Sequence, residues 1–203
     1  MLKEDNRFTA VELFAGAGGI ALGLEKVGFN TILLNEIDKD CVQTLRNNRP
    51  KWNVVQKDIK ELDFTGIEAD VVTGGFPCQS FSHAGKRLGF EDIRGTLFFQ
   101  FARAVKEIQP KIFWAENVAG LANHDNGRTL NTMIDVLTSL KYKVKYQILD
   151  AVNYSVPQKR KRIIIIGTKK GINFNFPERH NKIVTIKDAL KNVPSSIGVK
   201  YSE

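Results

Sequence analysis

Apolar runs of strand length alternate with stretches of helical spacing along the first 140 residues, and this alternation restricts the fold more than any other feature of the chain. The runs are rich in Val, Ile, Leu and Phe, whereas the stretches between them place apolar side chains every three or four positions. Strands are expected at residues 9–14, 31–36, 53–55, 71–74 and 112–116, and helices at residues 19–27, 39–47, 97–108 and 130–140. Repeated strand–helix–strand units form a mostly parallel sheet with helices on both faces, so the pattern predicts a doubly wound α/β fold.

The pattern changes after residue 140. Tyr142, Val144, Tyr146 and Ile148 alternate with polar residues, which predicts a half-buried strand with one wet face. A strand expected to be fully buried follows at residues 162–167, around four consecutive isoleucines, with no helix between, so we expect one of these two strands to be antiparallel.

The size of the chain fits one domain followed by a tail. A chain of 203 residues, 42% of them hydrophobic, can bury one substantial core. Beyond Gly171 the periodicity fades into a Pro-punctuated segment with one short helix candidate at residues 186–190. We therefore expect one domain over residues 1–171 and a C-terminal tail over residues 172–203.

Charge, cysteine content and hydropathy limit the classes of function. The chain has 30 Lys and Arg residues against 22 Asp and Glu residues, a net charge of +8 that suits a polyanion partner. Cys41 and Cys78 are the two cysteines, and with no Cys-x-x-Cys spacing and three histidines they argue against a disulfide framework and against a metal site. No apolar run reaches the ~18 residues of a membrane span and no signal-peptide pattern opens the chain, so we expect a cytoplasmic protein without a membrane partner.

Cys78 follows an apolar strand and a Gly74-Gly75-Phe76-Pro77 turn, and it precedes a polar loop. A free cysteine is usually a small buried hydrophobe. Here the turn ends the strand ladder and leaves the thiol at the carboxyl end of the strand, the edge at which open α/β sheets bind ligands. This position favours a covalent nucleophile.

A glycine-rich turn, Gly16-Ala17-Gly18-Gly19, connects the first expected strand to the first helix. The glycines permit a tight turn and let a ligand approach the backbone at the helix N-terminus. Glu36 ends the second strand 20 residues after Gly16, where its carboxylate can accept hydrogen bonds from ribose hydroxyls, and Asp58 follows the third strand as a possible acceptor for an adenine amino group. Two carboxylates with no basic residue at the turn favour S-adenosylmethionine over NAD.

Glu116 closes the fifth expected strand, next to the strand that leads to Cys78. The two side chains would face one cleft, which makes Glu116 a candidate general acid. Arg160 and Arg162 lie in the basic run just before the buried residues 163–166, so the start of a core strand fixes Arg162 at the sheet edge. A guanidinium there suits a carbonyl oxygen or a phosphate.

In this order, the motifs resemble those of the cytosine-5 DNA methyltransferase family. The resemblance covers residues 8 to about 170, and its matching stretches are Leu13-Phe14-Ala15-Gly16-Ala17-Gly18-Gly19, Asn35-Glu36, Asp58-Ile59, Gly75-Phe76-Pro77-Cys78-Gln79-Ser80, Arg94-Gly95-Thr96-Leu97-Phe98-Phe99, Glu116-Asn117-Val118 and Pro157-Gln158-Lys159-Arg160-Lys161-Arg162. It implies a class I S-adenosylmethionine-dependent methyltransferase fold and methylation of carbon 5 of a flipped cytosine in double-stranded DNA. It also implies a bacterial or phage restriction-modification setting, with the protein associated with the nucleoid.

The resemblance assigns a role to each matching residue. Cys78 would add to carbon 6 of cytosine, Glu116 would hold N3 and the exocyclic amine, Arg162 would bind the O2 carbonyl, and Arg160 would bind a nearby phosphate. Eight positions match cofactor contacts of the family: Phe14, Gly16, Gly18, Glu36, Asp58, Ile59, Pro77 and Leu97. Ile37 stands where many members place an aromatic side chain over the adenine.

Family members continue into a variable recognition region and then into a segment that completes the cofactor pocket, and neither pattern occurs before Glu203. We therefore expect either a subunit of a split enzyme or a truncated reading frame. In both cases the chain is expected to be inactive until a second polypeptide supplies the recognition region.

Three alternatives remain at this point. A NAD-binding oxidoreductase accounts for Gly16, Gly18 and Glu36 but gives no role to Cys78 or Glu116. A non-catalytic nucleic-acid-binding module of the same fold accounts for the charge. An RNA cytosine-5 methyltransferase would use the same chemistry on another substrate.

Overall fold

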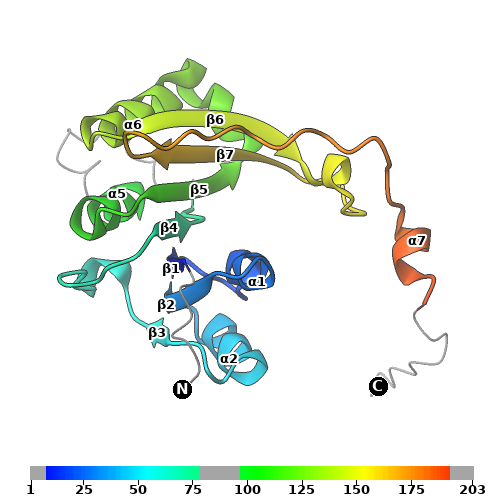
Figure 1. Cartoon of the computed structure of the whole chain (residues 1–203), viewed down its shortest axis with the longest axis horizontal. Coiled ribbons are helices and arrows are strands. Elements are labelled where there is room, and N and C mark those ends of the chain that lie inside the picture. The colour runs from blue at the N-terminus through cyan, green and yellow to red at the C-terminus, as the bar shows by residue number, and fades with distance from the viewer. Residues whose placement is uncertain (1–7, 78–96, 193–203) are drawn as a thin grey trace.

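The computed structural model describes residues 8–77 and 97–192, and these residues form a seven-stranded sheet covered by helices (Figure 1). The elements in chain order are β1 Thr9–Leu13, α1 Gly19–Lys26, β2 Asn30–Glu36, α2 Lys39–Asn48, β3 Val54–Gln56, η1 Ile59–Glu61, β4 Val71–Gly74, α5 Leu97–Ile108, β5 Ile112–Val118, η2 Ala119–Gly127, α6 Arg128–Ser139, β6 Lys143–Asp150, η3 Ala151–Tyr154, β7 Lys161–Thr168 and α7 Ile186–Leu190.

The strands lie in the order β3-β2-β1-β4-β5-β7-β6. β3, β2, β1, β4 and β5 are parallel, and β7 is antiparallel to both of its neighbours. The doubly wound, mostly parallel sheet with one antiparallel strand near the C-terminal end is therefore confirmed. Its chain reversal occurs where the sequence has no helix between two strands, because a short connection cannot carry a strand back to the parallel direction.

The helices cover the two faces of the sheet unequally. α5 and α6 lie on one face and α1 and α2 on the other (Figure 1). The larger core fills the α5–α6 face, where Phe98, Phe101, Phe113 and Met133 are fully buried. Aromatic contacts continue from Phe101 and Phe98 to Phe76, just after β4, so the core extends to the sheet edge on which the predicted nucleophile was placed.

The expectation that the apolar side of β6 would be buried along its length is wrong. Tyr142 is buried and Val144 is partly buried against the core, but Tyr146 and Ile148 are 50% and 41% exposed. Apolar alternation predicts which residues share a face of a strand, but not how far a neighbouring helix covers that face.

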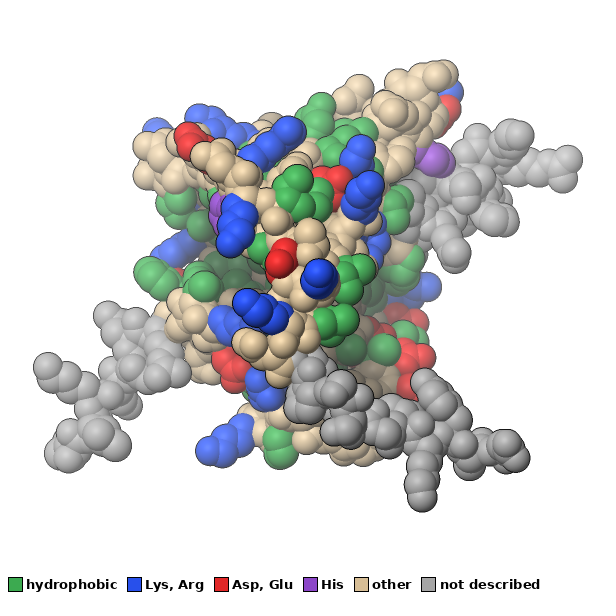
Figure 2. All heavy atoms as spheres, turned by 90° about the vertical axis from the view of Figure 1, so that its right-hand side faces the viewer, with side chains coloured by type: hydrophobic (Ala, Val, Ile, Leu, Met, Phe, Trp, Pro, Cys, Tyr) green, Lys and Arg blue, Asp and Glu red, His purple; other side chains and the backbone are tan. Residues whose placement is uncertain are grey.

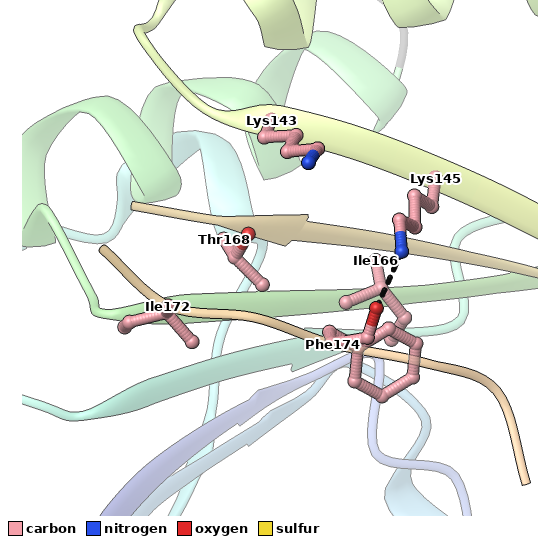
Figure 3. A pocket seen from close by; sticks show the side chains of 6 residues that line it. All are labelled: Lys143, Lys145, Ile166, Thr168, Ile172 and Phe174. Carbon is pink, nitrogen blue, oxygen red and sulfur yellow. Dashed lines mark hydrogen bonds between the residues drawn. The ribbon is translucent and has the colours of Figure 1, made fainter. Parts of the chain in front are cut away.

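The segment after β7 turns back and runs along the β6–β7 hairpin (Figures 1 and 3). It continues into α7, the short helix expected at residues 186–190, whose capping box joins Thr185 and Asp188. None of the helices in the described part of the chain is long and apolar enough to cross a membrane.

Candidate active site

The carboxyl ends of β1, β2, β4 and β5 meet at one edge of the sheet, and the antiparallel β7 begins at the same edge. This edge collects the turns that the sequence singled out: the glycine-rich turn after β1, Glu36, the segment after β4, the end of β5 and the residues before β7. Ligands of open α/β sheets bind at this edge.

The glycine-rich turn folds tightly over the end of β1. Gly16 and Gly18 have φ angles of +53° and +84°, the left-handed region that glycine adopts without strain, and Phe14 also has a positive φ of +57°. The amide of Gly16 donates to Oε2 of Glu36 at 2.7 Å. The glycine-rich turn and Glu36, which the sequence predicts to lie at one ligand site, are therefore in direct contact.

Glu36 and Asp58 lie at the ends of neighbouring strands. Oε1 of Glu36 also accepts hydrogen bonds from the amides of Ile37 and Asp38 at 2.8 and 2.9 Å, so the backbone fixes the carboxylate in place. Asp58 accepts from the amide of Lys60 at 3.0 Å and begins η1. Oε2 of Glu36 and both carboxylate oxygens of Asp58 keep a lone pair for a ligand, and Ile37 beside them is 62% exposed.

The other residues matched to cofactor contacts have different surroundings. Phe14 makes an edge-on contact with Phe76, and Pro77 is exposed. Leu97 opens α5 and is partly buried against the core. The side chain of Ile59 is 3% exposed and belongs to the core, so only its backbone is available to a ligand at this edge.

Glu116 and the two predicted arginines form a cluster of charges. Nε of Arg162 lies 2.8 Å from Oε1 of Glu116, and a terminal nitrogen of Arg160 lies 3.6 Å from the same oxygen. Glu116 and Arg162 belong to adjacent antiparallel strands, where Arg162 pairs with Val118, and their side chains are about one quarter exposed. The three residues named from sequence are thus brought together, with polar groups still open to solvent.

The segment after β4 packs against the end of β5. A Cβ atom placed on Gly75 would lie 3.4 Å from Oε2 of Glu116, so the carboxylate lies close against this glycine. The side-chain amide of Asn117 donates to the carbonyl of Phe76 at 2.9 Å. Cys78, the predicted nucleophile, follows Pro77 directly in the sequence and lies outside the described residues.

Two buried polar residues at this edge were missed from the sequence. Asn117 stands beside Glu116 in the stretch Glu116-Asn117-Val118, but the sequence alone assigns it no role. Glu12 lies within β1 and is 1% exposed, and its Oε2 has no hydrogen-bond partner among the described residues. Desolvation raises the pKa of Glu12 to about 8, while a hydrogen bond to the backbone of Ala21 in α1 acts in the opposite direction. A carboxyl group inside an apolar strand is the signal that could have revealed it.

The basic residues are concentrated in one part of the chain. Residues 141–191 contain 13 Lys and Arg residues against 3 Asp and Glu residues. Figure 2 looks onto the side of the molecule that carries the β6–β7 connection and α7, and Lys and Arg side chains are spread over its middle and upper parts. This surface adjoins the edge where Arg160 and Arg162 lie.

Cys41 does not share the features of the predicted nucleophile. It lies in α2, where the hydrogen bond with Asp38 and partial burial raise the pKa of its thiol. Within residues 8–77 and 97–192, no group of three or more His, Cys, Asp or Glu side chains is placed to hold a metal ion.

Comparisons with known proteins agree with this geometry. The family model for C-5 cytosine-specific DNA methylases matches residues 8–202. The type II methyltransferase M.Eco47II of Escherichia coli is 55% identical over 97% of this chain and 51% of its own length, and M.PspPI of Psychrobacter sp. is 53% identical over 97% and 50%. A solved structure described as a DNA modification methyltransferase from an Escherichia coli prophage superposes with a TM-score of 0.77 at 29% identity, covering 93% of this chain and 56% of that one.

These matches show a class I methyltransferase fold. The chain spans about half the length of the curated relatives it matches.

Proposed function

This chain belongs to the C-5 cytosine-specific DNA methylase family, and on that premise we propose that it is the catalytic part of a DNA (cytosine-5)-methyltransferase of a restriction-modification system. The observation that carries the proposal is the cluster of Glu116, Arg160 and Arg162 against the segment that leads into Cys78. The NAD-dependent and non-catalytic alternatives give this cluster no role.

The methyl donor is proposed to be S-adenosylmethionine, and the residues at the edge fit it. Glu36 is fixed by three backbone amides beside the turn and can accept from ribose hydroxyls, while Asp58 on the next strand can accept from an adenine amine. A Cβ on Gly16 would meet no atom within 4 Å, so a ligand can approach the turn closely there. When bound, this cofactor supplies an electrophilic methyl group. Phe14, Gly18, Pro77, Leu97 and the backbone of Ile59 complete the proposed contacts.

The protein groups would make carbon 5 of cytosine reactive. The thiolate of Cys78 adds to carbon 6, and the electrons of the 5,6 double bond become available at carbon 5 as Glu116 protonates or holds N3. Arg162 holds the O2 carbonyl, where negative charge develops, and Arg160 holds a phosphate of the flipped nucleotide. After methylation, loss of the carbon 5 proton and of the thiolate restores the aromatic ring.

The substrate class is DNA, and the basic surface around residues 141–191 supports binding to its phosphates. Reading a sequence requires side chains that reach base edges, and a base can react only after it leaves the stack. The second polypeptide expected from the sequence stays a prediction, as does the division into a domain over residues 1–171 and a tail.

Covalent trapping on 5-fluorocytosine DNA tests the proposal, because fluorine blocks release of the thiol. The chain is assayed with S-adenosylmethionine, alone and with the C-terminal half of M.Eco47II as a separate polypeptide. We expect a covalent complex with the second polypeptide present. It should be lost in Cys78→Ser and kept in Cys41→Ser, the matched cysteine control. Trapping that survives Cys78→Ser, or is absent in both mixtures, would contradict the proposal, and trapping on 5-fluorocytosine RNA alone would favour the RNA alternative.

A further inference from the structure

The β6–β7 connection (residues 151–160) carries Arg160 to the proposed active site and leads directly to Arg162. Two hydrogen bonds close its base: the amide of Ala151 donates to the carbonyl of Arg160 at 3.0 Å, and the amide of Arg160 donates to the side-chain Oδ1 of Asp150 at 3.0 Å. These bonds join the two ends of the connection to each other. The backbone of its outer turn, residues 153–156, is joined to the base by the amide of Val156, which donates to the carbonyl of Ala151 at 3.3 Å, and its side chains are contacted from outside the connection.

The segment after β7 reaches the outer turn from the far end of the hairpin. Lys145 of β6 donates from Nζ to the carbonyl of Phe174 at 2.6 Å and contacts Oδ1 of Asn175 at 3.2 Å. Figure 3 shows this bond where Phe174 and Ile172 lie over the hairpin and enclose a small pocket with side chains of both strands. Lys145 thus directs the segment along the hairpin toward the connection.

At the connection, four contacts join residues 153–155 to His180 and Pro177. The amide of His180 donates to the carbonyl of Asn153 at 2.8 Å, and Nδ1 of His180 lies 2.7 Å from Oγ of Ser155. The ring of Tyr154 packs edge-on against the imidazole at a centroid distance of 5.9 Å, and its hydroxyl donates to the carbonyl of Pro177 at 3.3 Å. All of these partners are at least 23 residues apart in sequence.

Ser155, one of the residues contacted by His180, has an unusual backbone conformation. It adopts a left-handed backbone conformation, with φ of 63° and ψ of 22°, at the point where η3 ends and the chain turns toward Arg160. A residue with a side chain rarely occupies this region unless its surroundings hold it there. The imidazole of His180 bonds the side chain of this residue.

We propose that His180 is a positioning residue for the active site: by holding Ser155 in its left-handed conformation, it sets the course of the β6–β7 connection and hence the place of Arg160. The inference rests on the proposed function for the role of Arg160. The holding contact itself involves only residues of this chain and can be tested without catalysis.

The rate of limited digestion with trypsin measures how often the connection opens. The outer turn is followed by a run of four cleavage sites: Lys159, Arg160, Lys161 and Arg162. Cleavage is mapped by mass spectrometry, with the other tryptic sites as an internal reference. We expect His180→Ala to speed cleavage in this run by about fivefold or more, since proteolysis follows the population of the open form. His180→Asn retains a hydrogen-bonding atom near the position of Nδ1 and should restore slow cleavage. His124→Ala removes a similar bond, from His124 to Thr129 at 2.7 Å, and should leave the run unchanged.

A second substitution distinguishes an effect of His180 on the backbone conformation of Ser155 from a general loss of stability in the connection. Glycine occupies the left-handed region without strain, so Ser155→Gly should make His180 dispensable. The double variant Ser155→Gly, His180→Ala should therefore be cleaved about as slowly as the wild type. If His180→Ala leaves the run as resistant as before, or if the double variant is cleaved as fast as His180→Ala alone, the inference is wrong.

The kinetics of methyl transfer test whether the β6–β7 connection positions Arg160 for binding DNA. We expect His180→Ala to raise the KM for DNA severalfold while kcat changes less than about twofold. The reason is that phosphate binding by Arg160 weakens, whereas the protein groups that contact the cytosine ring remain in place. Normal kinetics in a variant whose connection has opened would overturn the positioning role. If trypsin gives the expected pattern but the wild type transfers no methyl group in any mixture, the proposed function fails, while the holding contact stands.

Discussion

The side-chain amide of Asn117 donates to the carbonyl of Phe76 at 2.9 Å, and this bond ties the end of β5 to the residue two positions before Cys78. Both residues are buried, at 4% and 2% exposure. The acid Glu116 and the segment that leads to the nucleophile are therefore joined through adjacent residues of one strand.

Replacing Asn117 with Ala should affect both stability and catalysis. The Phe76 carbonyl would lose its donor while buried, which costs about 1–3 kcal/mol of unfolding free energy. The segment before Cys78 would also lose its tether to β5, so we expect slower trapping on 5-fluorocytosine DNA. Urea denaturation and the trapping rate measure the two effects.

Asn117→Asp is the control, because it keeps the shape of the side chain and the oxygen that accepts from the Val118 amide at 2.8 Å. It replaces the donor to Phe76 with a carboxylate oxygen, which repels the Phe76 carbonyl at a buried position, and it should slow trapping at least as much as Asn117→Ala. An undiminished trapping rate in both variants would rule out the tether.

Arg162→Lys should separate catalysis from stability. The pair with Glu116 is partly exposed, and such pairs contribute about 0–1 kcal/mol, so the free energy of unfolding should change little. Lys keeps the charge but loses the planar donors that would hold the O2 carbonyl. The rate of methyl transfer should therefore fall about 10²–10³-fold. Lys161→Ala, at the exposed neighbouring position, should leave the rate nearly unchanged, and equal losses in the two variants would argue against a specific role.

The fold was predictable because its signals are local. Helical spacing located α5 at Leu97–Ile108 without error, and the missing helix between β6 and β7 identified the chain reversal. The contact of Gly16 with Glu36 was also predictable, because parallel neighbouring strands bring their carboxyl ends together.

The supporting contacts could not be read from sequence, since they depend on tertiary packing. Nothing in the tail indicates that His180 returns to Ser155, and the alternation of β6 does not reveal that Tyr146 remains exposed. Burial of Glu12 depends on how closely α1 packs over β1. The residue type at such positions is visible in the sequence, but its partner is not.

Glu12→Gln should change how stability depends on pH. The pKa of Glu12 is about 8 in the folded chain against an ordinary value of 4.5, so the folded state binds the extra proton between these values. Stability therefore falls as pH rises from 4.5 to 8 and levels off above 8. Gln cannot ionise, and the variant should lack a fall of roughly 3–5 kcal/mol. Unfolding free energies of both proteins at pH 5 and pH 8.5 measure the difference. Parallel pH profiles would show that the carboxyl ionises as freely in the folded chain as in the unfolded one.

Alanine at Gly16 and at Gly18 should have different main consequences, although both glycines have positive φ angles. A Cβ at Gly18 would lie 2.5 Å from Cδ2 of Leu45 and 3.1 Å from the ring of Trp52, so Gly18→Ala combines backbone strain with overpacking. We expect it to lose about 2–4 kcal/mol of unfolding free energy.

A Cβ at Gly16 would meet no atom of the protein, so Gly16→Ala should lose only about 1–2 kcal/mol through strain. The added methyl group would instead project where the proposed cofactor approaches the turn. Calorimetry with S-adenosylmethionine should therefore show weaker binding for Gly16→Ala than for the wild type, at a temperature where both are folded. Glu25→Gln, on the exposed side of α1, serves as a control that should bind normally. Undiminished binding by Gly16→Ala would mean that the cofactor does not approach this turn.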